Sequence, residues 1–234
     1  MRPVSPESLA NPIAVPRQSA SQTRPKTPVS PPPFGAKRAF DLGIVLAAAP
    51  IWVPVVFLLW VLVRRDGHDG FFAQTRVGYS GRAFKMWKLR TMVPEAEAAL
   101  QALLANDLKA AQEWEQRQKL TADPRLTTLG RSLRKYSLDE LPQLWNVLRG
   151  EMSLIGPRPF LPEQKPLYDA VPGSNAYYTV RPGIGGPWQV GSRNASSFKS
   201  RVAYDAKYVS DLSLYRDLVL LVRSAARMVR PSGI

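Results

Sequence analysis

Two adjacent carboxylates, Asp139 and Glu140, lie in a stretch crowded with basic side chains. The neighbouring cations in the sequence are Arg125, Arg131, Arg134, Lys135, Arg149 and Arg158. Magnesium is usually held by one or two carboxylates and completes its shell with phosphate oxygens. Arginine binds phosphate through two parallel hydrogen bonds, and a carboxylate can itself attack phosphorus. The pattern therefore predicts a site for a phosphorylated substrate and a metal ion.

The same residues also have a purely structural interpretation. Ser137 followed three positions later by Glu140 is the pattern of a capping box at a helix N-terminus. Pro142 is tolerated only near a helix start, and Gly150 is placed to end the helix. Both interpretations predict a short helix that ends near Gly150, and they differ in what the two carboxylates contact.

Four segments of the chain resemble a known family. They are SLDEL at 137–141, GPRP at 156–159, VRPG at 180–183 and WQV at 188–190. QTRVG at 74–78 and FKMWKLRTM at 84–92 match it as well. The chain is similar, from about residue 37 nearly to its end, to the bacterial sugar transferases. These are monotopic phosphoglycosyl transferases that move a sugar-phosphate from a UDP-sugar onto a polyprenyl phosphate.

The resemblance implies a mechanism and a set of roles. Asp139 would be the nucleophile that attacks the β-phosphate, releases UMP and leaves a covalent phosphosugar. Undecaprenyl phosphate would then take the group, which starts an exopolysaccharide or glycoconjugate repeat unit. Glu140 would bind Mg²⁺, and Arg134 and Arg158 are candidates for phosphate contacts. The chain looks closest to members that transfer galactose or glucose.

A glycine-rich turn at 183–186 is the expected wall for the nucleotide or the sugar, because glycines allow close backbone approach to a ligand. Arg181, Gln189 and Arg193 are the candidate binding residues beside it. Family members usually carry a threonine where this chain has Gly185, and the order at 191–193 is also exchanged. These departures bear on the sugar site and not on the acidic pair.

An uncharged apolar run at 42–63 is long enough to span a bilayer, which takes about 20 residues. Basic pairs flank it on both sides, at 37–38 and 64–65. Positive charge favours the cytoplasmic side, so both ends are drawn to the same face. Pro50 and Pro54 interrupt the run and favour a bend. We therefore expect a re-entrant helix-break-helix over 37–65, with a straight span or a buried core helix as alternatives.

The remaining patterns predict the other elements. Residues 71–92 indicate a β-hairpin with its turn at 79–82, in which Lys85, Lys88 and Arg90 face either phosphates and lipid headgroups or solvent. A long helix is expected from Pro94 to about residue 120, a short strand at 177–180, and a basic amphipathic helix at 212–229 that lies at the membrane or packs on the core.

These elements predict an α+β fold that is mostly helical. It comprises a disordered, basic, Pro/Ser-rich tail at 1–36, the membrane hairpin, and a compact catalytic domain at 66–234 with interfacial helices. We expect the domain on the cytoplasmic face of the bacterial inner membrane. The sequence is compatible with a homo-oligomer.

The composition limits the alternatives. Its 32 lysines and arginines against 18 acidic residues give a formal net charge of +14, which predicts an anionic partner. The absence of cysteine excludes disulfides and thiol catalysis, and His68 as the only histidine excludes a histidine-based zinc site. A membrane-tethered nucleic-acid binder rests on charge alone and lacks a recognition motif. A catalytically silent anchor of a polysaccharide assembly complex is the other alternative.

Overall fold

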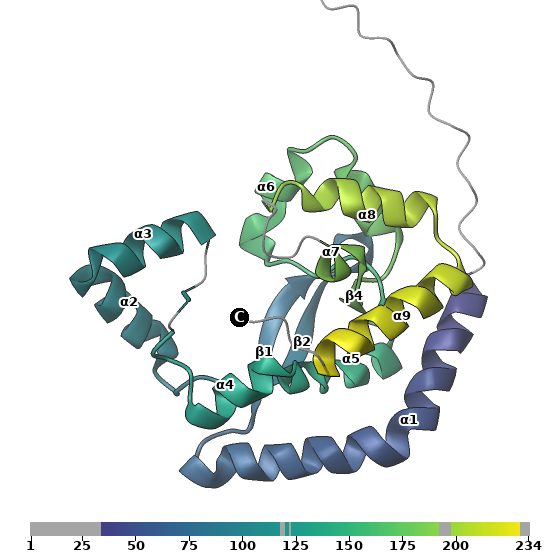
Figure 1. Ribbon diagram of the computed structural model, residues 1–234. Helices are drawn as coiled ribbons and strands as arrows, with labels where there is room; N and C mark the ends of the chain where they lie inside the picture. The colour runs from purple at the N-terminus through teal and green to yellow at the C-terminus, as the bar shows by residue number, and fades with distance from the viewer. Residues whose placement is uncertain (1–33, 118–119, 122, 192–197, 230–234) are drawn as a thin grey trace, which may run out of the picture.

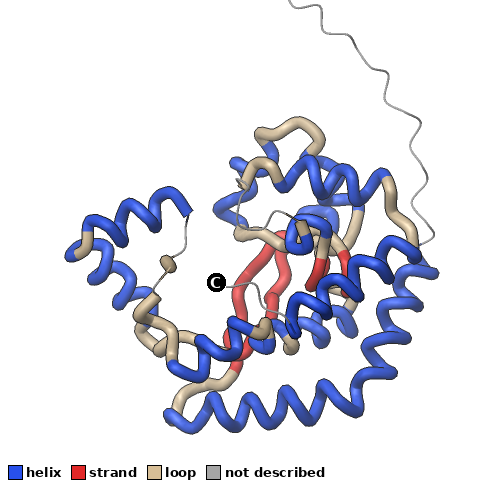
Figure 2. Tube along the Cα trace, viewed as in Figure 1, coloured by secondary structure: helices blue, strands red, loops and turns tan. Residues whose placement is uncertain are grey.

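The computed structural model describes residues 34–117, 120–121, 123–191 and 198–229. Arg193 and residues 1–33 of the predicted tail lie outside these residues. The last three residues of that tail, 34–36, were predicted to be disordered but form the first turn of α1. The helices in chain order are α1 (Phe34–Val63), α2 (Ala96–Asn106), α3 (Leu108–Arg117), α4 (Thr128–Lys135), α5 (Gln143–Arg149), α6 (Lys165–Asp169), α7 (Pro187–Val190), α8 (Arg201–Ser210) and α9 (Leu214–Val229). The strands are β1 (Phe71–Val77), β2 (Ala83–Leu89), β3 (Ser153–Ile155) and β4 (Gly183–Gly185). The fold is mostly helical with small sheets, as predicted (Figure 2).

The predicted β-hairpin is confirmed, since β1 and β2 pair antiparallel with Phe71 opposite Leu89 and Val77 opposite Ala83. A second sheet, in which β3 and β4 pair in parallel, was not predicted. The strand expected at 177–180 is wrong, because Ser174–Thr179 forms a 3-10 helix. Tyr177 lies within that turn, where its hydroxyl donates to the carbonyl of Val77 at the end of β1.

Helix α1 bends sharply, so that its ribbon runs in two arms along two sides of the molecule (Figure 1). Pro50 and Pro54 lie inside it, and each removes one backbone hydrogen bond. The indole Nε1 of Trp52 donates to the carbonyl of Val45 at 3.0 Å. The expected break is thus a bend within one continuous helix. Whether the bend re-enters a membrane stays a prediction.

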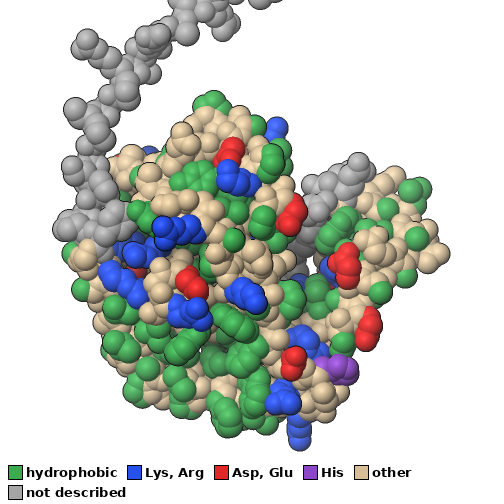
Figure 3. All heavy atoms as spheres, turned by 180° about the vertical axis from the view of Figure 1, so that it is seen from behind, with side chains coloured by type: hydrophobic (Ala, Val, Ile, Leu, Met, Phe, Trp, Pro, Cys, Tyr) green, Lys and Arg blue, Asp and Glu red, His purple; other side chains and the backbone are tan. Residues whose placement is uncertain are grey.

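The two sides of α1 differ in exposure. Val45, Val56 and Val63 are buried against the rest of the fold, whereas Ile51 and Phe57 expose 72% and 63% of their surface. Hydrophobic side chains gather along the lower edge of the molecule, where α1 runs (Figure 3). Within the described residues, one helix, Gly35–Asp66, is long and apolar enough to cross a membrane by length and composition. The exposed apolar side is the surface that membrane association requires.

The long helix expected after Pro94 is in fact two helices, which stand to one side of the body in Figure 1. Asp107 separates α2 from α3 in an extended conformation. Its carboxylate accepts hydrogen bonds from the backbone N–H groups of Lys109 and Ala110, so it caps α3. Leu108, the first residue of α3, is 74% exposed.

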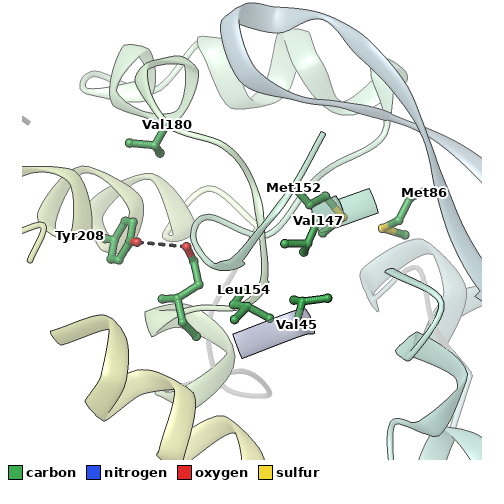
Figure 4. Packing of buried hydrophobic residues seen from close by; sticks show 8 residues of the cluster. Val45, Met86, Val147, Met152, Leu154, Val180 and Tyr208 are labelled. Carbon is green, nitrogen blue, oxygen red and sulfur yellow. Dashed lines mark hydrogen bonds between the residues drawn. The ribbon is translucent and has the colours of Figure 1, made fainter. Parts of the chain in front are cut away.

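The main hydrophobic core joins segments that are distant in the sequence (Figure 4). Val45 of α1, Met86 of β2, Val147 of α5 and Ile155 of β3 pack in one cluster. The hydroxyl oxygen of Tyr208 in α8 lies 3.1 Å from the carbonyl oxygen of Ile155. The first arm of α1 is therefore part of the folded core, while other side chains of the same helix form its exposed apolar side.

We expect Lys37→Met to destabilise the fold by about 3–5 kcal/mol, because it would leave the carboxylate of Asp217 buried without its ionic partner. Lys37 pairs with Asp217, whose side chain is fully buried and also accepts a 2.8 Å hydrogen bond from Tyr208. The half-exposed pair Lys165–Asp169 is the control. Lys165→Met should cost no more than about 1 kcal/mol. Chemical denaturation in detergent measures both, and equal losses would contradict the prediction.

Candidate active site

The acidic pair lies on a 3-10 turn, Leu138–Glu140, just before α5. Ser137 enters the turn in the left-handed conformation (φ 54°), which is uncommon for a residue other than glycine. The predicted capping box is wrong, because Ser137 makes no side-chain cap and α5 has Pro142 as its N-cap. The predicted helix end is confirmed, with Gly150 left-handed at the C-cap. The carboxylates are therefore free of the capping role.

Asn146 fixes α5 against the open edge of β2. Its amide oxygen accepts from the backbone N–H of Trp87 at 3.1 Å, and its nitrogen donates to the carbonyl of Lys85 at 2.7 Å. The same nitrogen donates to Glu151 at 2.7 Å, and the side chain is fully buried. The next strand residue, Lys88, is thereby brought to the acidic turn. Sequence reasoning missed this role, because a lone asparagine inside a helix carries no signal.

Lys88 and Arg158 hold the carboxylate of Glu140. The Nζ of Lys88 donates to Oε1 of Glu140 at 2.9 Å and lies 3.8 Å from Oδ2 of Asp139. The guanidinium of Arg158 donates to the same Oε1 at 2.8 Å. Of the two sequence interpretations of Lys88, the one that faces it toward the site agrees with this geometry.

The two carboxylates differ electrostatically. Burial alone would raise the pKa of Glu140, but the charges and hydrogen bonds of Arg158 and Lys88 hold it well below its usual range. Burial raises the pKa of Asp139, and the neighbouring charge of Glu140 adds to this, while Lys88 opposes it. Glu140 is thus a fixed anion, and Asp139 is the more basic of the two. A more basic carboxylate is the better nucleophile of the pair.

Two of the family-like motifs meet at the β3–β4 pair. The N–H of Gly183 donates to the carbonyl of Pro157 at 2.8 Å, and the N–H of Gly156 donates to the carbonyl of Gly185 at 2.9 Å. A Cβ on Gly183 would overlap the backbone of Gly156, so glycine is required there. This close approach holds the loop that carries Arg158 toward the acidic turn.

The other predicted residues fall in different places. Arg134 donates to the hydroxyl of Thr91 at 2.9 Å, and its charge lowers the pKa of Asp139, so it belongs to the site's surroundings. Arg181 donates to the carbonyl of Gly150 at 2.8 Å, at the C-terminal end of α5, away from the acidic turn. Gln189 donates to the carbonyl of Ile184 at 3.2 Å. Roles in binding the nucleotide or sugar stay predictions.

Arg201 and Arg76 are neighbours of the site that the sequence interpretation left out. Arg201 is buried and donates to the carbonyl of Arg158. Its Cζ lies 5.0 Å from the ring centre of Trp188 and 5.0 Å from that of Phe198. It therefore ties the WQV segment to the GPRP loop. Burial and the charges of Arg158 and Arg201 lower the pKa of Arg76 to about 10. These crowded guanidinium groups make the region strongly attractive to an anion.

Asp205 gives this region a pH dependence, because burial raises the pKa of its carboxyl to about 6 against the opposing charge of Arg201. In the fold it keeps its proton to a higher pH than in the unfolded chain. This stabilisation is complete below about pH 4 and is lost as pH rises through about 6. The difference corresponds to about 3 kcal/mol.

We expect Asp205→Asn to remove that slope. The unfolding free energy of the variant, relative to wild type, should rise by about 3 kcal/mol between pH 4 and pH 7. Urea unfolding at both values measures it, and Asp169→Asn, in which a more exposed carboxylate is changed, should show no such rise. Parallel pH curves for wild type and Asp205→Asn would contradict the assignment.

The donor set fits a divalent cation that shares its ligands with a phosphorylated substrate. Within the described residues there is no group of three or more acidic, histidine or cysteine side chains that would hold a metal alone. Lys88 and Arg158 both donate to Oε1 of Glu140, and within the described residues its Oε2 accepts no hydrogen bond. Magnesium commonly takes one or two carboxylates and completes its shell with phosphates and water. Asp139 and Glu140 meet that requirement.

The fold and the site define a class of protein in which paired carboxylates, bound by a lysine and an arginine, lie on a domain that carries a bent apolar helix. The family model described as bacterial sugar transferase matches residues 33–231, so the chain belongs to that family. It is 42% identical over 198 residues to the undecaprenyl-phosphate galactose phosphotransferase of Salmonella typhimurium, covering 84% of this chain and 41% of that protein. It is 38% identical over 218 residues to the exopolysaccharide production protein ExoY of Rhizobium meliloti, covering 93% and 92%.

A third relative is the undecaprenyl-phosphate glucose phosphotransferase of Komagataeibacter xylinus, 35% identical over 203 residues, which cover 82% of this chain and 36% of that protein. The chain therefore spans less than half the length of the two phosphotransferases and most of the length of the Rhizobium protein. The matched region includes the acidic turn, the hairpin and the GPRP and VRPG segments.

Proposed function

We propose that this chain transfers a sugar-1-phosphate from a UDP-sugar to undecaprenyl phosphate, releases UMP, and so begins an exopolysaccharide or glycoconjugate repeat unit. The observation that carries the proposal is the acidic turn. Asp139 is buried, takes no part in a helix cap, and lies beside a fixed anion and Lys88. The names of the Salmonella and Komagataeibacter relatives, which act on undecaprenyl phosphate, support the same lipid acceptor.

The reaction proceeds in two displacements at one phosphorus atom. A carboxylate oxygen of Asp139 bonds to the β-phosphorus, and the bond from that phosphorus to the bridging oxygen breaks, so UMP leaves with that oxygen. A phosphate oxygen of the acceptor lipid then bonds to the same phosphorus. The bond to Asp139 breaks, which restores the carboxylate and yields a lipid-linked diphosphate sugar.

The surrounding cations position the phosphates and offset their charge. Lys88 lies close to both carboxylates, and its charge opposes the rise in the pKa of Asp139, which favours the ionised form that attacks phosphorus. Arg158 and Arg134 lie on the approach to the turn and supply donors to phosphate oxygens. Glu140 would hold magnesium, and the ion would offset the charge on the transferred phosphoryl group.

The membrane arrangement follows from the chemistry of the two substrates. One is a lipid and the other is water-soluble, so a site at the cytoplasmic face of the inner membrane reaches both. The bent helix α1, with its exposed apolar side, enters and leaves that face, and the basic amphipathic helix α9 lies along it. A cysteine introduced by Arg2→Cys and labelled in sealed vesicles tests this. Labelling on the face opposite the catalytic domain would refute the re-entrant path.

The direct test of function is UMP release by purified protein with magnesium, undecaprenyl phosphate and a panel of UDP-sugars. Release with one donor that stops on chelation of magnesium would establish the reaction, the donor and the metal. Mass analysis after incubation with the donor alone should find a phosphosugar adduct on the peptide containing Asp139. No release from any donor would favour a silent anchor of an assembly complex, while salt-sensitive binding of DNA or RNA would favour the nucleic-acid alternative.

A further inference from the structure

Two aromatic side chains are exposed at the start of β1. Phe71 exposes 39% of its surface and Phe72 exposes 49%. Phe72 pairs directly with Lys88 in the antiparallel ladder, and Phe71 pairs with Leu89. Directly opposite residues project from the same face of a hairpin with their Cβ atoms about 5 Å apart. The ring of Phe72 is therefore a lateral neighbour of Lys88.

Lys88 is the lysine that contacts both carboxylates of the acidic turn. A half-exposed ring beside such an ammonium group offers an apolar surface next to a cation, and a purely polar ligand would leave that surface unused. The cation and the ring together match an amphiphile whose phosphate is joined directly to a hydrocarbon chain.

The opposite face of the same hairpin end leads to the apolar side of α1. Phe71 stacks on Trp60 with ring centres 6.1 Å apart, and Trp60 stacks on Phe57 at 5.9 Å. Phe57 is 63% exposed on the second arm of α1. Phe72 therefore lies on the face of the hairpin that carries the site lysine, and the adjacent Phe71 lies on the face that joins the apolar surface of α1.

We propose that Phe72, supported by Phe71, binds the isoprenoid chain of the acceptor lipid next to its phosphate. The proposal rests on the proposed function, since it assigns the acceptor side of that site. Phe72 contacts the first isoprene units while Lys88 faces the phosphate. The rest of the isoprenoid passes around the start of β1 to Phe71 and the apolar side of α1. The ring therefore selects a lipid phosphate over a free phosphate.

The test is calorimetric binding of farnesyl phosphate, a short isoprenoid phosphate, to the full chain in detergent, with inorganic phosphate as the head-group control. Phe72→Ser should weaken farnesyl phosphate binding about tenfold, the value expected for losing partial burial of one phenylalanine. Phe72→Leu, which stays apolar, should remain within about threefold of wild type. Leu108→Ser removes an exposed apolar side chain from α3, which is not part of the site, and should change nothing.

Two further readouts separate this role from others. UMP release from the donor in the absence of any acceptor should be the same in Phe72→Ser and wild type. Unchanged affinity of Phe72→Ser for farnesyl phosphate would overturn the proposal, and so would weaker vesicle binding with unchanged farnesyl phosphate affinity, which indicates a membrane anchor only. If the wild type releases no UMP from any donor, the proposed function fails, while the calorimetry still decides whether Phe72 holds an isoprenoid phosphate.

Discussion

Replacing the nucleophile by its amide, Asp139→Asn, should lower both UMP release and sugar-phosphate transfer by about 10³-fold or more. The amide has nearly the same shape, and Asp139 makes no hydrogen bond that the structure records within the described residues, so the fold should be kept. What is lost is the charged oxygen that bonds to phosphorus. The measurement is the rate of UMP release with the active donor, accompanied by mass analysis for the covalent adduct.

The matched control is Asp169→Asn. Asp169 pairs with Lys165 at the protein surface, outside the acidic turn. The Asp169→Asn protein should therefore release UMP at the wild-type rate. A thermal unfolding curve confirms that both variants are folded. If Asp139→Asn retains the adduct on Glu140, the roles of the two carboxylates are exchanged. If it retains full activity without an adduct, the covalent mechanism is wrong.

The sequence predicted the features that depend on local chemistry. Turn residues at 79–82 between two β-favouring runs gave the hairpin, and Gly150 ended α5 because glycine accepts the left-handed conformation at φ 78°. Pro50 and Pro54 indicated the bend of α1, since each removes a backbone donor wherever the helix lies. Arg158 was predicted as a phosphate contact, which stays a prediction, and the structure places its guanidinium on Glu140, 18 residues away.

The features that it missed depend on contacts between distant segments. Asn146 binds the edge of β2 across 59 residues, and Arg201 binds the carbonyl of Arg158 across 43. A three-residue parallel pair such as β3–β4 has too few side chains to show a period. The break at Asp107 was missed because of a local pattern. The leucines on both sides of it continue one helical period, whereas the carboxylate of Asp107 caps a new helix.

The short pair β3–β4 should contribute strongly to the free energy of unfolding, and Gly183→Ala tests this. A Cβ at this position would overlap the backbone nitrogen of Gly156, and no side chain can move aside to make room. We expect a loss of about 3 kcal/mol or more in the free energy of unfolding, as for other overpacked core positions. Chemical denaturation in detergent measures it.

Gly43→Ala is the matched control, because a Cβ there meets nothing within 4 Å and alanine favours the helix of α1. It should unfold like wild type or slightly later. Gly183→Ala protein that still folds must move the loop after β3, and this loop carries Arg158 to Glu140. We therefore expect it to lose UMP release even under conditions in which it is folded. Full activity in a folded Gly183→Ala protein would show that the meeting of the GPRP and VRPG segments supports the fold alone and does not position the site.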